Sequence, residues 1–289
     1  MRQRIFTLST KTQIEFRQIM LAEENLIATT RQSRKGNMED ALDEVMTRCA
    51  IRIVDPGPYT FLEVGDKPDW KRMAKGDRFG SMIDLRCLSY KDGHLYEAEL
   101  RCPSSTCGKK FGWEVNLETE LIRQDMPDES LEKIKNGQPF VVEIAGKKIS
   151  YTIAYGKTEE TFDALSAQYP DRDMSSAFRS RIVDIEGVAP RDYMDWLDGN
   201  NGDEKCKYQG LSSEEAEDLR DAFDVIDGGI DTSMEAECPH CRGWFDFSLP
   251  FSGIFLPGRG IIQRRRIARE QKNASKKMKN LQQENDSEK

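Results

Sequence analysis

Residues that enzymes commonly use for catalysis are scarce in this chain. Its 289 residues include only two histidines. The sequence has no G-x-S-x-G nucleophile turn, no G-x-x-x-x-G-K phosphate loop and no H-E-x-x-H metal motif. Acids are abundant, with 51 Asp and Glu, so chance pairs of carboxylates are expected and none indicates an active site. We therefore predict a protein that is not an enzyme, and an enzyme with an unfamiliar site is the weaker alternative.

Long apolar runs are also absent. No stretch approaches the ~18 residues of a membrane-spanning helix, and the first residues, Met1-Arg2-Gln3-Arg4, lack the apolar segment of a signal peptide. The seven cysteines are odd in number and unevenly spaced, which makes a poor disulfide framework and fits a reducing compartment. The sequence therefore predicts a cytoplasmic protein with no membrane partner.

Positive charge is concentrated at one end of the chain. The net charge is −8, yet the residues from Arg259 to Lys289 carry ten Lys or Arg against four Asp or Glu. The preceding residues therefore carry a net charge of −14, which opposes a broad nucleic-acid groove. We expect residues 259–289 to form a basic tail, helical or disordered, through which nucleic acid stays an alternative partner.

Two short cysteine motifs carry the clearest chemical signal. Each has a proline directly after its first cysteine, and the second reads Cys238-Pro239-His240-Cys241. Two neighbouring thiolates can bind one tetrahedral metal ion, and a closed structural zinc site needs four ligands. No position is then left for a catalytic water. We therefore predict one structural Zn²⁺ bound by both motifs, with the ligands Cys102, Cys107, Cys238 and Cys241.

The surroundings of the motifs lead to further expectations. Gly243 is expected to take the positive φ that points backbone amides at the sulfurs. Four cations are expected to offset the charge of about −2 on a zinc ion with four thiolates: Arg101, Lys109, Lys110 and Arg242. An iron–sulfur cluster is an alternative, although its common spacings are absent. His240 is either a further metal ligand or an exposed spacer.

Aromatic residues follow both cysteine motifs. Trp113, Trp244 and Phe245 are expected to pack against neighbouring strands, and stacking on nucleic-acid bases is the alternative. Cys49 and Cys87 lie among apolar residues and are predicted to be buried thiols, whereas Cys206 is predicted to lie in an exposed loop.

Hydrophobic periodicity predicts an α+β fold. The first half of the chain is predicted to contain a hairpin at 5–9 and 13–17, helices at 19–27, 38–52 and 69–89, and strands at 94–100 and 111–117. The second half is predicted to contain a hairpin at 140–144 and 148–154, helices from 158, at 190–197 and at 212–226, and strands at 230–236 and 244–249. In each half the last two strands flank a cysteine motif.

This shared order of elements predicts an internal duplication, roughly residues 1–123 and 137–252. Asp84-Leu85-Arg86 and Asp218-Leu219-Arg220 occupy corresponding places ahead of the two motifs. We predict two duplicated lobes joined by a split zinc-ribbon-like site. The expected boundaries are an N-terminal lobe at 1–123, a connection at 124–136, a C-terminal lobe at 137–258 and the tail at 259–289. Chance similarity between mixed α+β segments is the alternative.

Several segments together resemble the baseplate hub assembly proteins, or assembly chaperones, of contractile-tailed bacteriophages. The resemblance is carried by Met20-Leu21-Ala22-Glu23-Glu24, by the run from Leu85 to Gly93 before Cys102-Pro103, by Gly229-Ile230-Asp231-Thr232 before the second cysteine motif, and by Leu249-Pro250-Phe251 with Phe255-Leu256-Pro257. The spacing of four residues within the first cysteine pair departs from the two or three of the family.

The resemblance implies a protein that helps to build the phage tail or baseplate hub and catalyses no reaction. Its expected partners are phage tail or baseplate hub proteins. It is expected to act in the host cytoplasm during phage assembly, or to be part of the virion tail or baseplate. The competing class is a zinc-ribbon protein that binds nucleic acid or regulates transcription.

Overall fold

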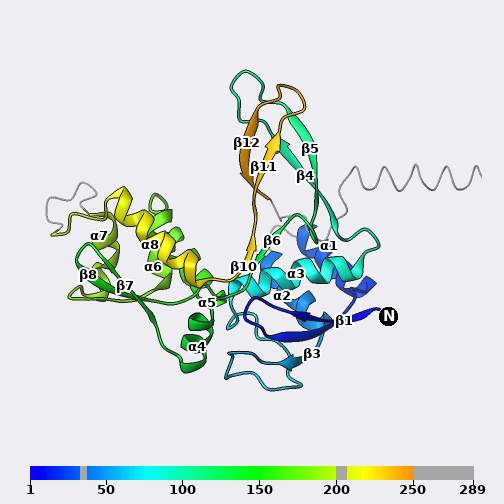
Figure 1. Ribbon diagram of the computed structural model, residues 1–289, viewed down its shortest axis with the longest axis horizontal. Coiled ribbons are helices and arrows are strands. Elements are labelled where there is room, and N and C mark those ends of the chain that lie inside the picture. Colours follow the sequence, from blue (N-terminus) through cyan, green and yellow to red (C-terminus); the bar gives the residue numbers. More distant parts are fainter. Residues whose placement is uncertain (33–37, 200–206, 250–289) are drawn as a thin grey trace, which may run out of the picture. The chain divides into compact units, whose positions relative to one another are not determined.

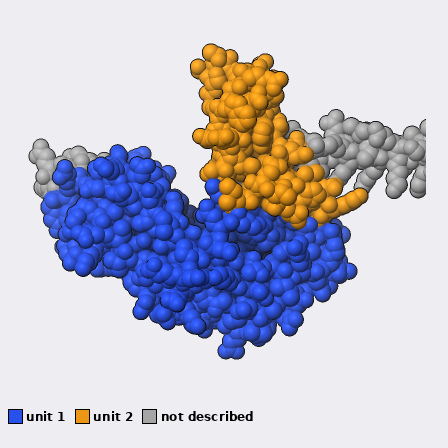
Figure 2. Space-filling view, viewed as in Figure 1, with its two compact units in different colours: residues 1–89, 123–231 blue, residues 90–122, 232–289 orange. Residues whose placement is uncertain are grey.

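The computed structural model describes residues 1–32, 38–199 and 207–249 of the chain (Figure 1). It confirms the predicted mixture of helices and small antiparallel sheets. The described residues divide into two compact units, coloured separately in Figure 2: unit 1 lies within residues 1–89 and 123–231, and unit 2 contains residues 90–122 and 232–249. Cys206 and the basic tail at 259–289 lie outside the described residues.

The first sheet of unit 1 has the strand order β1-β2-β3. β1 (Gln3–Thr7) and β2 (Gln13–Arg17) form the predicted hairpin, although β1 lies two residues earlier than the predicted 5–9. Alternation along β2 buries Ile14 and Phe16 completely. Helices α1 (Leu21–Gln32) and α2 (Met38–Cys49) precede β3 (Ala50–Asp55). The predicted helix at 38–52 was therefore too long, since Ala50 already belongs to a strand that pairs with β2.

Helix α3 (Lys75–Ser89) packs beside this sheet and begins six residues later than predicted. Its first turn carries Asp77, which is 1% exposed. The Asp77 carboxylate accepts hydrogen bonds from Ser9 Oγ at 2.7 Å, from the Thr10 backbone N–H at 3.2 Å and from Tyr59 Oη at 2.8 Å. Thr10 Oγ1 is a further donor. One buried carboxylate thus holds the β1–β2 turn to α3.

The second sheet of unit 1 repeats this arrangement with the order β7-β8-β9. β7 (Phe140–Ile144) and β8 (Lys147–Tyr151) form the predicted hairpin, and Ala145 and Gly146 turn it with positive φ values of 52° and 67°. Helices α5 (Gly156–Gln168) and α6 (Asp173–Arg181) lead to β9 (Ile182–Ile185), which pairs with β8. Each sheet is therefore a hairpin extended by a strand that follows two helices.

The remaining elements of unit 1 connect these parts. Helix α4 (Asp128–Asn136) lies within the predicted connection, and a short 3₁₀ helix, η1 (Pro190–Asp192), precedes α7 (Tyr193–Asp198). Helix α8 (Ser213–Ile226) starts at the predicted cap, because Ser212 Oγ accepts from the Glu215 N–H at 3.2 Å. The helix expected from Thr158 begins instead at Gly156. β6 (Ile122–Gln124) pairs with β10 (Gly229–Asp231).

Glycines permit close backbone contact inside unit 1. A Cβ atom on Gly76, in α3, would overlap the carbonyl oxygen of Gly228, and one on Gly228 would lie 2.8 Å from the Met126 backbone nitrogen. Gly156 approaches Lys71 in the same way, because a Cβ atom added to Gly156 would lie 2.7 Å from the Lys71 Cα. Glycine is required at these places because no side chain fits between the two backbones.

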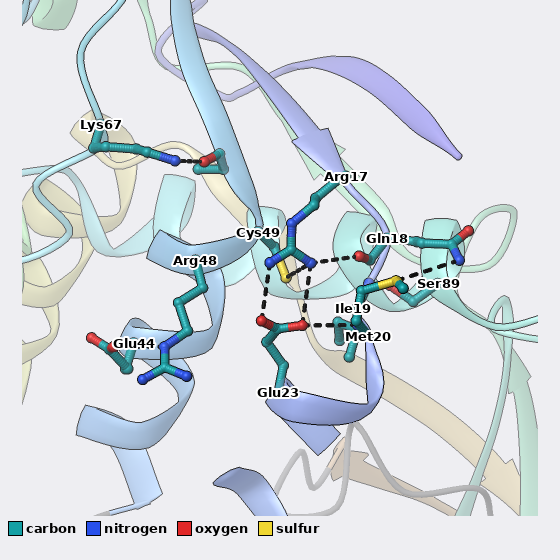
Figure 3. Close-up of polar contacts among 11 residues, drawn as sticks. Arg17, Gln18, Ile19, Met20, Glu23, Glu44, Arg48, Cys49, Lys67 and Ser89 are labelled. Carbon is teal, nitrogen blue, oxygen red and sulfur yellow. Dashed lines mark hydrogen bonds and ion pairs between the residues drawn. The ribbon is translucent and has the colours of Figure 1, made fainter. Parts of the chain in front are cut away.

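A buried ion pair supports the start of α1 (Figure 3). Glu23 is 4% exposed and accepts from Arg17 at 3.0 and 3.2 Å and from the Met20 N–H at 2.9 Å. Arg17 lowers the pKa of Glu23 below its ordinary value. Arg17 Nη1 also lies 3.8 Å from the sulfur of Cys49, whose pKa burial raises to about 12. Glu23, in the Met20–Glu24 segment, therefore has a structural role. Cys49 is buried as predicted, whereas Cys87, also predicted to be buried, is half-buried.

Candidate metal centre

Unit 2 is built from two antiparallel hairpins. β4 (Leu95–Arg101) pairs with β5 (Lys110–Asn116), and β11 (Ser233–Glu237) pairs with β12 (Trp244–Ser248). Figure 1 shows the hairpins side by side, with their connecting loops at the same end. The loop of each hairpin contains one cysteine motif. The pairs that close the loops are Arg101 with Lys110 and Glu237 with Trp244.

The two loops share a local conformation. The residue after the second cysteine has a positive φ in both: 57° at Gly108 and 63° at Arg242. The expectation that Gly243 would take this conformation is wrong, because Arg242 takes it one residue earlier. Gly243 instead lies close to the Cys241 sulfur: a Cβ atom added to Gly243 would be 3.5 Å from that sulfur. A left-handed residue at this point turns the chain back, and the Cys238 N–H then donates to the Gly243 carbonyl at 2.9 Å.

The four predicted ligands lie together in unit 2. Their sulfur atoms are all within 4.8 Å of one another. The Cys102 and Cys241 sulfurs are 3.7 Å apart, and those of Cys107 and Cys238 are 3.8 Å apart. Four thiolates at the zinc–sulfur bond length of about 2.3 Å would have edges of about 3.8 Å in a tetrahedron. The spacing and the all-sulfur donor set therefore fit a zinc ion, and they fit other metals that prefer thiolates.

Burial differs among the four thiols. Cys102 and Cys238 are buried, Cys107 is half-buried and Cys241 is exposed. For Cys238, burial opposes the thiolate, but backbone N–H groups of Cys241 and His240 and the neighbouring thiols outweigh it and lower the pKa to about 7. For Cys102, a backbone hydrogen bond from Ser104 favours the thiolate, while burial and the other thiols raise the pKa to about 11. A cation among these sulfurs would favour the thiolate form of all four.

Three of the four cations predicted to offset the thiolates have other polar partners. Arg101 Nε donates to the Gly108 carbonyl at 3.1 Å. Lys110 pairs with Glu99 at 2.7 Å, and Arg242 pairs with Glu237 at 3.2 Å. His240 is exposed and is not among the four residues that can hold a metal ion.

Aromatic packing joins the two hairpins. The rings of Phe111 in β5 and Phe245 in β12 meet edge to face at 6.2 Å, and Phe245 also contacts Phe247. Phe245 thus packs against strands as expected, and Trp113 is half-buried. Trp244 departs from the expectation, because 67% of it is exposed. Alternation along β12 explains this, since Trp244 faces away from Phe245 and Phe247. The same alternation, applied to residues 244–248 of the sequence, would have predicted that Trp244 lies on the opposite face from Phe245 and Phe247.

These features define a class: an α+β protein in which two hairpins, distant in sequence, bring four thiols into one cluster able to hold a metal ion. Residues 1–244 match the family described as T4 bacteriophage base plate protein. The chain belongs to this family. The match includes all four cysteines. No curated protein and no solved structure matches the chain.

Membership of this family supports a structural role in a phage baseplate, with other baseplate proteins as partners. It gives no support to the alternative of a nucleic-acid-binding zinc-ribbon protein. Among the helices of the described residues, none is long and apolar enough to cross a membrane.

Proposed function

We propose that the chain assembles the baseplate hub, or forms part of it, without catalysing a reaction, and that a structural Zn²⁺ joins its two hairpins. Its proposed ligands are Cys102, Cys107, Cys238 and Cys241. The observation that carries this proposal is the clustering of four thiols from loops 131 residues apart, measured from Cys107 to Cys238, in a member of a baseplate family.

When bound, zinc would supply a cross-link and no reaction chemistry, because four thiolates leave no open position on the ion. The chain's own residues would prepare the site. Backbone N–H groups of His240 and Cys241 stabilise the Cys238 thiolate. The Phe111–Phe245 contact aligns the two hairpins. In small zinc domains such an ion contributes on the order of 10 kcal/mol of apparent folding free energy at neutral pH.

We also propose that the chain arose by the duplication predicted above, of residues 1–123 and 137–252, which lie in the N-terminal lobe (1–123) and the C-terminal lobe (137–258). Support comes from the order of elements, since β1 to β3 and β7 to β9 have the same pairing and each is followed later by a cysteine hairpin. A zinc ion would then link one loop from each copy. The acidic residues before 259 and the basic tail would serve contacts with other proteins of the tail or hub.

Metal analysis tests the proposed site. The purified full-length chain is expected to contain about one zinc and no iron per molecule. Cys238→Ser should lose the zinc and expose unit 2 to proteolysis. Cys87→Ser is the matched control, because Cys87 is a half-buried thiol outside the cluster and its variant should retain zinc. A wild-type protein that contains iron in place of zinc, or neither metal, would refute the proposal of a zinc site.

A complementation experiment tests the proposed role. A phage that carries this gene with a nonsense mutation should produce no complete baseplates, and wild-type protein supplied from a plasmid should restore them. Mass spectrometry of purified virions and of the host cytoplasm would show where the protein acts. Normal baseplates from the mutant phage in the absence of the protein would rule out the assembly role.

A further inference from the structure

The end of unit 2 that holds the thiol cluster has an unusual surface. We call residues 101–110 and 238–244 the hairpin tip. The sequence of the tip contains four cations and no Asp or Glu, although residues 1–258 carry a net charge of −14. All four cations are exposed: Arg101, Lys109, Lys110 and Arg242. A zinc ion with four thiolates would contribute about −2, which leaves about +2 on these residues before the flanking acids Glu99 and Glu237 are counted.

The tip also exposes a large aromatic side chain. Trp244 is 67% exposed, whereas Phe245, next to it in the chain, packs between the hairpins. Tryptophan and arginine are the residues most enriched in the energetic centres of protein interfaces. Pro239 and His240, also exposed, lie in the same loop. The tip therefore combines an apolar anchor with surrounding positive charge.

The existing ion pairs of the tip leave its cations able to change partners. Lys110 pairs with Glu99 through side chains that are 66% and 63% exposed, and Arg242 pairs with Glu237 through side chains that are 78% and 33% exposed. Such surface pairs contribute only about 0–1 kcal/mol each. An acidic partner surface can replace these acids at small cost, and would gain more where water is excluded around Trp244.

We propose that the hairpin tip is a docking surface for an acidic face of another baseplate protein, with Trp244 as its anchor. The inference rests on the proposed assembly role, which supplies the class of partner. A protein surface fits better than nucleic acid for two reasons. Four cations around a single exposed tryptophan form a small footprint, and the strong negative charge of the rest of the chain repels a long polyanion.

Photo-cross-linking during infection tests the proposal. p-Benzoylphenylalanine is placed at position 244 in one variant and at position 225 in another. Val225 is the matched control because it is 69% exposed, is apolar and lies in unit 1. We expect adducts at position 244, absent at 225, with one identified baseplate protein through a peptide rich in Asp and Glu. Adducts with nucleic acid, the same adducts at both positions, or none at 244 would overturn the proposal.

The affinity for the partner identified in this way gives the second measurement. Trp244→Ala should weaken binding by at least about 30-fold, as expected for an interface anchor, and Val225→Ala should leave it unchanged. Lys109→Glu should slow association and reduce its dependence on salt. Zinc content reports folding of the tip in each variant. A folded, metal-loaded Trp244→Ala protein that binds as tightly as wild type would refute the docking surface while leaving the assembly role intact.

Discussion

The pair of Arg181 and Asp227 allows a quantitative test of how unit 1 is stabilised. Arg181 ends α6, and Asp227 follows α8 directly. Two hydrogen bonds join them, at 2.8 and 3.0 Å. The Arg181 side chain is 10% exposed and that of Asp227 is 28% exposed. Burial lowers the pKa of Arg181 and raises the pKa of Asp227, in both cases against the attraction between them. Burial therefore opposes the charged form of both partners, and each charge relies on the other for compensation.

The expected cost of breaking this pair follows from burial. Asp227→Leu leaves a nearly buried guanidinium without its counter-charge, which costs about 3–5 kcal/mol in buried pairs. The cost should lie near the lower limit, about 3 kcal/mol, because Arg181 keeps its bond to the Thr152 carbonyl and its position 4.2 Å from the Phe223 ring centroid. Arg181→Met should cost about 2 kcal/mol, since Asp227 can reach water.

The double variant Arg181→Met/Asp227→Leu distinguishes the pair from two independent contacts. It removes both charges and refills the space, so it should lose only about 2 kcal/mol, a coupling of about 3 kcal/mol. Urea unfolding at pH 7, followed by far-ultraviolet circular dichroism, measures these values. Asp221→Ala removes another exposed acid from α8; it is the control and should change stability by less than ~0.5 kcal/mol. Additive single effects would refute the reasoning.

Three further predictions concern single sites. Because Arg17 lowers the pKa of Glu23, this carboxylate stabilises the fold above its ordinary pKa of 4.5 and the contribution is lost as the pH falls through the folded value. Glu23→Gln should therefore flatten the acid limb of a stability profile, and an unchanged limb would contradict this. Gly76→Ala should lower the melting temperature by overlap with Gly228 and cost more than ~2 kcal/mol. Gly80→Ala, in the same helix with its nearest contact at 3.9 Å, should be neutral or stabilising; equal effects would disprove the overlap. Cys49 should resist alkylation in the native protein because burial raises its pKa to about 12, and rapid labelling at neutral pH would be the contrary result.

Local patterns predicted the hairpins and the thiol cluster well. Alternation with a period of two located β1 with β2 and β7 with β8, since each has one buried face. Cysteine spacing predicted the cluster, because a closed metal site needs four ligands and each motif offers two. The capping box at Ser212 located the start of α8. In each case the signal is a short local pattern: a pair of alternating strands, a two-cysteine motif or a capping box.

Features that depend on distant contacts could not be predicted in this way. β3 starts at Ala50, directly after α2 ends at Cys49, and β9 starts at Ile182, directly after α6 ends at Arg181. No glycine or proline marks either change from helix to strand. The change is instead fixed by strand pairing, of β3 with β2 and of β9 with β8. The contact of Gly76 with Gly228 spans 152 residues and leaves no local pattern. The left-handed Arg242 was missed because Gly243 stands beside it.

The long separation between the two cysteine loops also has a consequence during translation. The ribosome must add 130 residues after Cys107 before it reaches Cys238. At about 5–20 residues per second this takes on the order of ten seconds. During that interval the earlier thiols emerge without their counterparts, and a chain that terminates early can never complete the cluster. Closure of the four-thiol cluster therefore reports that synthesis has passed Cys241.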